Sequence, residues 1–175
     1  IENYMAAACA VEDFASDADI DAVARSFGGV EHRIELVREL DGVRYYNDSI
    51  ASSPTRTIAG LHSFDRRVIL IAGGYDKHIP FDALGPEICA HVRLLILCGA
   101  TADKIRAAVE GAPEYANGQP EIVTVQSLGD AVELAHMRAQ RGDIVTLSPA
   151  CAAFDQFKNF MVRGESYKRM VAALK

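Results

Sequence analysis

The chain of 175 residues is 50% hydrophobic and 24% charged, and 18 Lys and Arg against 24 Asp and Glu give a formal net charge of −6. This composition is typical of a soluble globular protein and excludes collagen-like, low-complexity and disordered classes. The acidic balance argues against nucleic acid or an anionic membrane as the main partner. The sequence contains no run of about 18 uncharged apolar residues, so it predicts no membrane-spanning helix. The length favours one domain with a short appendage.

The N-terminal segment predicts two helices. The first covers the alanine-rich residues 3–11, because alanine loses the least side-chain entropy in a helix. The second follows Ser16, which has capping-box spacing with Asp19, and it ends at Gly28-Gly29. The chain begins at Ile1 without an initiator methionine or a basic-then-apolar leader. We therefore expect an excised or processed piece rather than a secretory precursor.

From residue 33 onward, strand patterns alternate with helix patterns. Asp41-Gly42, a strong hairpin signal, separates strand-like runs at 34–40 and 43–47. Apolar runs predict further strands at 68–72, 94–98, 122–125 and 144–147. Helices are expected at 54–63, 81–91, 101–110, from 127 onward and at 166–174. The alternation predicts an α/β fold with a doubly wound, mostly parallel sheet that carries an N-terminal β-hairpin.

Ligands of such sheets bind beyond the carboxyl ends of the strands, so the loops there are the candidate sites. The first loop, 47–56, places Asp48 at a strand exit and Ser52 and Ser53 at a helix N-terminus. Free N–H groups and the helix dipole favour an anion at that position. A purely structural alternative is that the serines only cap the helix and Asp48 only forms a turn.

The second loop, 73–80, combines the paired glycines Gly73 and Gly74 with Lys77. Glycine pairs permit a ligand or another backbone segment to approach closely, and the lysine supplies a cation at the mouth of the sheet. The loop matches neither a P-loop nor a dinucleotide-binding glycine motif. An ordinary exposed lysine is the alternative interpretation.

The third loop, 147–160, runs from a strand into Ser-Pro and then into small and aromatic residues. Small side chains leave backbone amides accessible, which suits recognition of a carboxylate. Alternatively, its three phenylalanines, Phe154, Phe157 and Phe160, pack in the core.

Cysteine and histidine spacing predicts no metal site. The cysteines are scattered among apolar residues, at Cys9, Cys89, Cys98 and Cys151. The histidines show no metal-ligand spacing, at His32, His62, His78, His91 and His136. We expect buried free thiols in a reducing cytoplasm. Cys151 lacks an activating histidine and is a poor candidate nucleophile.

Taken in order, four motifs resemble the Mur ligases over essentially the whole chain. They are Gly28-Gly-Val-Glu-His-Arg33, Tyr46-Asn-Asp-Ser49, Ala72-Gly-Gly-Tyr-Asp-Lys77 and the long motif from Leu147 to Gly164. The resemblance implies a Rossmann-like C-terminal glutamate-ligase domain at 33–175. It also implies that residues 1–32 are the last two helices of the family's central ATP-binding domain.

The resemblance further implies a cytoplasmic, ATP- and Mg²⁺-dependent ligase of peptidoglycan precursor synthesis. The stretch Asp155-Gln-Phe-Lys-Asn-Phe160 favours the branch that adds D-glutamate to UDP-N-acetylmuramoyl-L-alanine through an acyl phosphate. The family's P-loop, magnesium ligands and modified lysine lie in the central domain. We therefore expect this chain alone to be inactive, with no confident catalytic residue or metal ligand of its own, and to act with the N-terminal and central domains of the same polypeptide.

The positions that match the family's ligand contacts fall into two groups. The resemblance implies a nucleotide group, with adenine at Asn3, phosphate at Arg33 and ribose at Asp48. It also implies a D-glutamate group, in which Ser52 and Lys77 bind carboxylates while Ala153, Phe154 and Phe160 hold the other end through backbone amides and an aromatic wall.

Two positions depart from the family pattern. Ile50 stands where many relatives have lysine, so one cation near the phosphates is lacking, and Arg56, one helical turn past Ser52, is a candidate replacement. Ala153 stands where serine is common, so a contact there must come from backbone N–H. Two alternatives to a D-glutamate ligase stay open. One is a sister ligase that adds another amino acid or a folate glutamate, and the other is a stand-alone nucleotide- or amino-acid-binding module.

Overall fold

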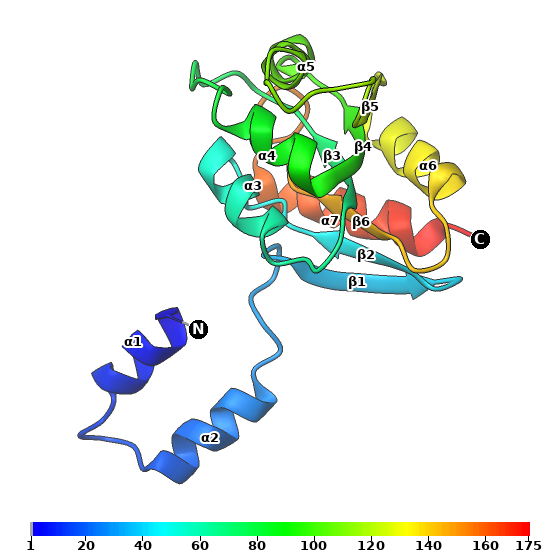
Figure 1. Cartoon of the computed structure of the whole chain (residues 1–175). Helices are drawn as coiled ribbons and strands as arrows, with labels where there is room; N and C mark the ends of the chain where they lie inside the picture. Colours follow the sequence, from blue (N-terminus) through cyan, green and yellow to red (C-terminus); the bar gives the residue numbers. More distant parts are fainter. Residues whose placement is uncertain (1) are drawn as a thin grey trace.

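The computed structural model describes residues 2–175, with side chains from Tyr4 onward. A pair of N-terminal helices stands apart from an α/β body built on a six-stranded sheet (Figure 1). Within the described residues, no helix is both long enough and apolar enough to cross a membrane.

The two predicted N-terminal helices are present as α1 (Glu2–Ala10) and α2 (Asp17–Ser26). The capping box forms as expected, since Asp19 N donates to Ser16 Oγ at 3.3 Å and Ser16 N donates to the Asp19 carboxylate at 3.0 Å. No residue of α2 is buried. Among the side chains that the structure describes, the two core clusters of the α/β body include no residue of α1 or α2.

The sheet has the strand order β1-β2-β6-β3-β4-β5. Its strands are β1 (Glu35–Leu40), β2 (Val43–Asn47), β3 (Val68–Ala72), β4 (Val92–Leu97), β5 (Glu121–Thr124) and β6 (Ile144–Leu147). β1 and β2 are antiparallel, and every other pairing is parallel. Asp41 and Gly42 both have positive φ, +52° and +80°, as a two-residue hairpin turn requires. The predicted α/β sheet with its hairpin is confirmed.

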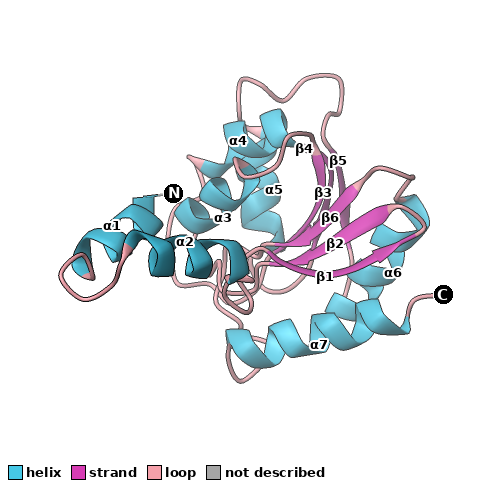
Figure 2. Ribbon diagram, turned by 90° about the horizontal axis from the view of Figure 1, so that it is seen from below, coloured by secondary structure: helices cyan, strands magenta, loops and turns pink. Residues whose placement is uncertain are grey.

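Helices cover both faces of the sheet (Figure 2). One face carries α3 (Pro54–Leu61), α4 (Leu84–His91) and α5 (Ala102–Glu110), and the other carries α6 (Leu128–Arg138) and α7 (Phe160–Ala173). Leu70 packs in the cluster under α3–α5, whereas Ile69 and Ile71 pack in the cluster under α6 and α7. Burial on both faces explains why β3 is a continuous apolar run.

The start of α7 was predicted wrongly, because the helix begins at Phe160 and not near residue 166. Asn159 caps it, accepting from Val162 N at 2.9 Å. Gly164 then lies inside the helix, where an added Cβ would come within 2.3 Å of His32 Nδ1. Glycine lowers helix stability, but here the packing of the His32 ring against α7 leaves no room for a larger side chain.

Two other helix starts differ from expectation. α4 begins at Leu84, three residues later than the predicted start at 81. Ser53 occupies the N-cap position of α3, but its side chain makes no capping hydrogen bond and lies 3.3 Å from Thr55 Oγ1.

Candidate functional site

Three loops leave the carboxyl ends of neighbouring strands. β6 lies between β2 and β3, with Leu147 in register with both Asn47 and Ile71. The chain passes from β2 and β3 to helices on one face, and from β6 to a helix on the other face. Such a reversal opens a crevice at the strand ends, where α/β sheets bind ligands. The predicted carboxyl-end location of the loops is confirmed.

Hydrogen bonds join these loops through the third one. Gly73 N donates to Pro149 O at 2.9 Å, and Tyr75 N donates to Ala152 O at 2.9 Å. The loop that follows β6 therefore holds the second loop directly.

Arg163, from α7, joins the first loop to the third. Its side chain is buried and donates to Ser49 Oγ at 3.0 Å, Ser49 O at 2.9 Å, Cys151 O at 3.0 Å and Ala152 O at 3.1 Å. All four acceptors are uncharged oxygens. Burial lowers the pKa of Arg163 to about 10, so the guanidinium stays charged at neutral pH. Arg163 therefore holds the first and third loops together through its hydrogen bonds to both.

Asp48 is 4% exposed and faces into the junction of the first and third loops. Its Oδ2 accepts from Ser148 Oγ at 2.7 Å, and its Oδ1 accepts from Ile34 N at 3.3 Å. Burial raises the pKa of Asp48 to about 6, against the lowering influence of these hydrogen bonds and of Arg33 and Arg56. The carboxylate is therefore largely ionised at neutral pH but partly desolvated, a state in which each hydrogen bond to it is strengthened.

Strained backbone gathers at this edge of the sheet. His32, Ile34, His78 and Ala150 all have positive φ, between +47° and +63°. This region is uncommon for residues other than glycine, and for a β-branched residue such as Ile34 it is an outlier. Such strain concentrates at functional sites, where the surrounding contacts hold it in place.

The paired glycines of the second loop serve backbone packing. A Cβ on Gly73 would lie 2.0 Å from Cys98 O, and one on Gly74 would lie 2.5 Å from Ala152 O. The neighbouring Asp76 is paired with Lys104. Lys77 is exposed, and in the described part of the chain no carboxylate lies within ion-pair distance of it. Its ammonium group is accessible to an anion.

Ser52 is half-buried at the start of the α3 region, and its N–H donates to Ile50 O at 2.8 Å. Arg56 is exposed in the first turn of α3, and its charge lowers the pKa of Asp48. Its role as a replacement for a lysine at Ile50 stays a prediction.

The three residues expected on the far side of the site have different surroundings. Ala153 is buried, and its carbonyl accepts from the backbone of the following turn. Phe154 is 64% exposed and packs edge-on against Tyr75, with ring centroids 5.9 Å apart. Phe160 is half-buried and packs edge-on against His32, also at 5.9 Å. The structure thus places Phe154 at the second loop and Phe160 beside His32.

The two remaining nucleotide-site candidates are Arg33 and Asn3. Arg33 is exposed two residues before β1, and its charge lowers the pKa of Asp48. Asn3 belongs to α1, but its side chain lies outside the described residues.

Comparison with known proteins settles the family. The sequence profile described as "Mur ligase, glutamate ligase domain" matches residues 32–151, more than half of the chain. The chain belongs to the Mur ligase family.

The similar Mur ligases include curated proteins called UDP-N-acetylmuramoylalanine–D-glutamate ligase. The one from Clostridium beijerinckii is 54% identical and one from Clostridium botulinum is 52% identical, each over 174 residues. These alignments cover 99% of this chain but 38% of each relative. The chain therefore spans less than two fifths of the length of these relatives.

Two solved structures of ligases share the fold of this chain. A murein peptide ligase from Psychrobacter arcticus has a TM-score of 0.59 at 16% identity, covering 99% of this chain and 37% of that one. A folylpolyglutamate synthase from Mycobacterium tuberculosis has a TM-score of 0.59 at 14% identity, covering 89% of this chain and 35% of that one.

Two polar residues of this Mur ligase chain escaped sequence reasoning. Arg163 lies within the motif from Leu147 to Gly164, and its spacing does not predict burial, because an arginine in a helix is normally exposed. His32 is buried, and Asn47 Nδ2 donates to its Nδ1 at 2.9 Å. The Gly164 that admits its ring was the only sequence signal for this contact.

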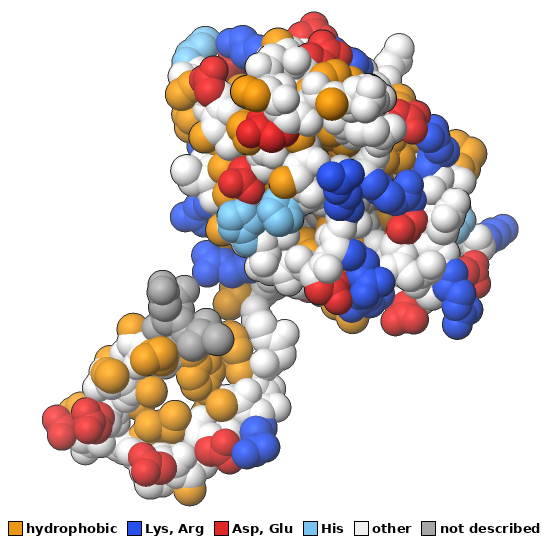
Figure 3. Space-filling view, viewed as in Figure 1, with side chains coloured by type: hydrophobic (Ala, Val, Ile, Leu, Met, Phe, Trp, Pro, Cys, Tyr) orange, Lys and Arg blue, Asp and Glu red, His pale blue; other side chains and the backbone are white. Residues whose placement is uncertain are grey.

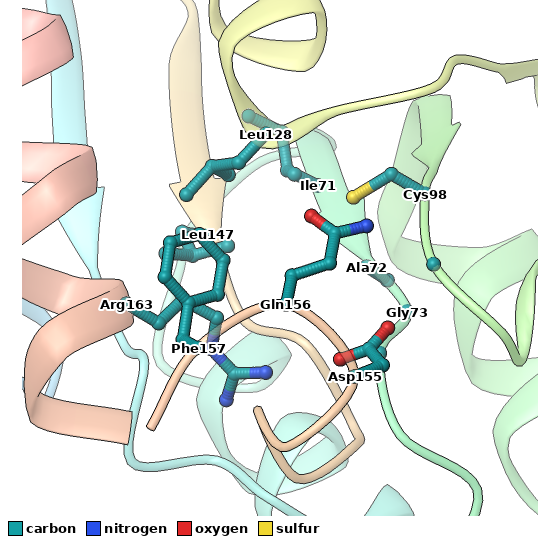
Figure 4. A pocket seen from close by; sticks show the side chains of 12 residues that line it. Ile71, Ala72, Gly73, Cys98, Leu128, Leu147, Asp155, Gln156, Phe157 and Arg163 are labelled. Atoms are coloured by element: carbon teal, nitrogen blue, oxygen red, sulfur yellow. The ribbon is translucent and has the colours of Figure 1, made fainter. Parts of the chain in front are cut away.

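A pocket lies beneath the third loop (Figure 4). Gly73 and Gly74 contribute one wall, and Asp155, Gln156 and Phe157 contribute another. Phe157 also packs against the core under α6 and α7. The turn 155–157 therefore lies beside the carboxyl ends of β3 and β6 in this Mur ligase domain.

The thiols follow the sequence expectation at three positions. All four cysteines are free, and Cys89, Cys98 and Cys151 are buried, whereas Cys9 is exposed on α1, contrary to the expectation that all four are buried. Burial raises the pKa of Cys98 and of Cys151 to about 11. Such thiols are inert at neutral pH.

Proposed function

We propose that this chain is the C-terminal, D-glutamate-binding part of an ATP-dependent ligase that adds D-glutamate to UDP-N-acetylmuramoyl-L-alanine. The observation that carries the proposal is identity of 54% and 52%, over 99% of the chain, to relatives of that name. In this reaction ATP phosphorylates the muramoyl-alanine carboxylate. The D-glutamate amine then attacks the acyl phosphate, which gives a peptide bond, ADP and phosphate. We place the reaction in the cytoplasm, in peptidoglycan precursor synthesis.

Residues 1–32 are proposed to belong to the central ATP-binding domain of the same polypeptide, and residues 33–175 to form the glutamate-ligase domain. Exposed apolar side chains on the N-terminal helix pair support this division. Phe14 is 89% exposed, Val23 57% and Phe27 58%, and they line a groove between α1 and α2 (Figure 3). An apolar groove of this kind is typical of a surface that another part of a protein covers.

For D-glutamate, we propose that Ser52 and Lys77 bind the carboxylates. The accessible ammonium of Lys77 supports this role, as does the position of Ser52 at a helix start. Ala153, Phe154 and Phe160 are proposed to hold the other end of the substrate. The exposure of Phe154 is consistent with an aromatic wall that a substrate reaches.

For ATP, we propose that Asn3 contacts adenine, Arg33 phosphate and Asp48 ribose. The Asp48 carboxylate can accept a hydrogen bond from a ribose hydroxyl. Each of its oxygens has two lone pairs and accepts one hydrogen bond within the chain, Oδ2 from Ser148 and Oδ1 from Ile34.

Mg²⁺ prefers a set of oxygen ligands. Among the described residues, the two clusters with metal-ligand geometry both contain histidine. Neither of these clusters among the described residues is an all-oxygen set that fits Mg²⁺, and we assign its ligands to the remainder of the polypeptide.

The test uses the full-length enzyme that contains this chain. Lys77→Ala is expected to raise the KM for D-glutamate by about 10- to 100-fold, the equivalent of a charged hydrogen bond, with little change in the KM for ATP. Arg141→Ala, which removes an exposed cation from the turn before β6, is the matched control and should change neither value. Unchanged D-glutamate kinetics in Lys77→Ala would refute the assignment.

A second measurement concerns the chain by itself. Phosphate release by the purified 175 residues, with all three substrates, should stay at background, because no P-loop motif occurs in the sequence. Turnover by the isolated chain would contradict the proposed division of labour.

A further inference from the structure

Two helices end side by side at the amino edge of the sheet. His62 is the C-cap of α3, and His91 is the last residue of α4, immediately before β4. α3 and α4 pack against each other (Figure 1). Because the candidate ligase site lies beyond the carboxyl ends of the strands, this corner is at the opposite end of the sheet. Nothing in the proposed reaction uses it.

Glu87 brings the two histidines together. It lies one turn before His91 on α4, and its Oε2 is 2.6 Å from His62 Nε2 and 3.6 Å from His91 Nε2. The imidazole rings have centroids 4.9 Å apart with a tilt of 54°. One ligand atom from each residue lies within 4.8 Å of the others. Histidine side chains gather on this face over α3 and α4 (Figure 3).

The electrostatics of the corner favour a cation. Both α3 and α4 point their C-terminal, partially negative ends at it. The nearby Arg67 guanidinium is engaged with Ala90 O at 3.1 Å. The three side chains are one third to one half exposed, so an ion reaches them from solvent without unfolding.

We propose that His62, Glu87 and His91 bind one Zn²⁺ ion, with water as a fourth ligand. Imidazole and carboxylate are ligand types that suit zinc, and an His₂Glu set with one open position is an established zinc arrangement. Zinc–nitrogen bonds of about 2.0–2.1 Å in a tetrahedron place ligand atoms about 3.4 Å apart. The distances of 2.6 Å and 3.6 Å from Glu87 Oε2 to the two histidine nitrogens lie on either side of this value. The ion joins α3 to α4 and stabilises the fold.

In the described part of the chain, a second cluster has metal-ligand geometry, but a lysine ammonium already occupies it. Glu31, His32 and Glu165 lie within ligand distance of one another. The Lys168 ammonium sits 2.8 Å from Glu31 and 3.1 Å from Glu165. An ion pair network therefore occupies the place that a metal would take.

The test is calorimetric titration of Zn²⁺ into the metal-free, untagged 175-residue chain. A Cys9→Ser background removes the exposed thiol, which is itself a zinc ligand type. We expect one equivalent of Zn²⁺ to bind, and His91→Gln and His62→Gln each to weaken binding by more than about tenfold. His78→Gln is the matched control. His78 is exposed and lies 3.6 Å from Asp76, but it belongs to neither cluster.

Cobalt and thermal unfolding give independent readouts. Co²⁺ bound at this site should show the strong visible absorption bands of a tetrahedral ion. These bands should be absent when Co²⁺ is added to His91→Gln. Zn²⁺ should raise the Tm of the parent and of His78→Gln, but not that of His91→Gln. Circular dichroism in EDTA checks that each variant is folded. Because His62 is more exposed than His91, His62→Gln should disturb the fold less than His91→Gln. Absence of a one-to-one site in the parent, or binding unchanged in both cluster variants, overturns the proposal.

Discussion

Asp48 destabilises the folded chain at neutral pH, and Asp48→Asn should relieve this effect. The carboxyl has a pKa of about 6 in the folded state, against its usual 3.8. Between these two values the folded state keeps a proton that the unfolded state has lost. The free energy of unfolding therefore falls as pH rises through this window. Asparagine has nearly the same shape but does not ionise.

The magnitude follows from the difference in proton affinity. The step from 3.8 to about 6, at about 1.4 kcal/mol per tenfold change, corresponds to about 3 kcal/mol. Asparagine still accepts from Ile34 N through its carbonyl oxygen, and the Ser148 hydroxyl rotates to accept from its amide. Relative to the parent, Asp48→Asn should therefore gain up to about 3 kcal/mol between about pH 4 and pH 7.

Urea unfolding followed by circular dichroism at several pH values measures this gain. Asp76→Asn is the control. The hydrogen bond from Lys104 lowers the pKa of Asp76, so its contribution is already complete above 3.8. Its stability curve should run parallel to that of the parent over the window. A free energy of unfolding of Asp48→Asn that also runs parallel to that of the parent, or falls relative to it as pH rises, would refute this explanation. Burial would then not be the cause that sets the pKa of Asp48.

Two further predictions concern stability. Arg163→Met should cost about 3 kcal/mol or more, because it leaves buried carbonyls of the first and third loops without a donor. Arg169→Ala, an exposed arginine on the same helix, should stay within about 0.5 kcal/mol, and similar losses in both would contradict a fastening role. Ser127→Ala should cost about 1 kcal/mol, since Ser127 caps α6. Ser53→Ala should cost less than half of that, since Ser53 makes no capping bond. Thermal unfolding distinguishes these cases, and equal losses for the two serines would refute the capping argument.

Local patterns predicted the elements whose cause is local. The capping box at Ser16, the helix start at Ser127 and the Asp41-Gly42 turn occur where the sequence indicates them. Each depends on hydrogen bonds or backbone angles within four residues, so sequence spacing is enough to identify it. The buried run of β3 was equally readable, because a strand covered on both faces needs apolar residues throughout.

Long-range contacts decided what sequence reasoning missed. Gly164 looks like a helix breaker but lies inside α7, because His32 from a distant segment occupies the space where its side chain would be. Arg163 is buried only because two other loops supply its acceptors. In each case the partner lies more than ten residues away or on another element, where no periodicity records it.

The alternation of strands and helices and the three polar loops after strand ends could be predicted from residue patterns alone. The position of β6 between β2 and β3 depends on tertiary contacts, and it makes the loop after β6 the one that binds the other two. The tertiary structure also decided that Asp48 is desolvated and that His62 and His91 meet at Glu87. Caps and turns depend on hydrogen bonds between residues close in the sequence, so residue spacing predicts them. The desolvation of a carboxyl group and the clustering of ligand side chains depend on which distant segments the sheet order brings together.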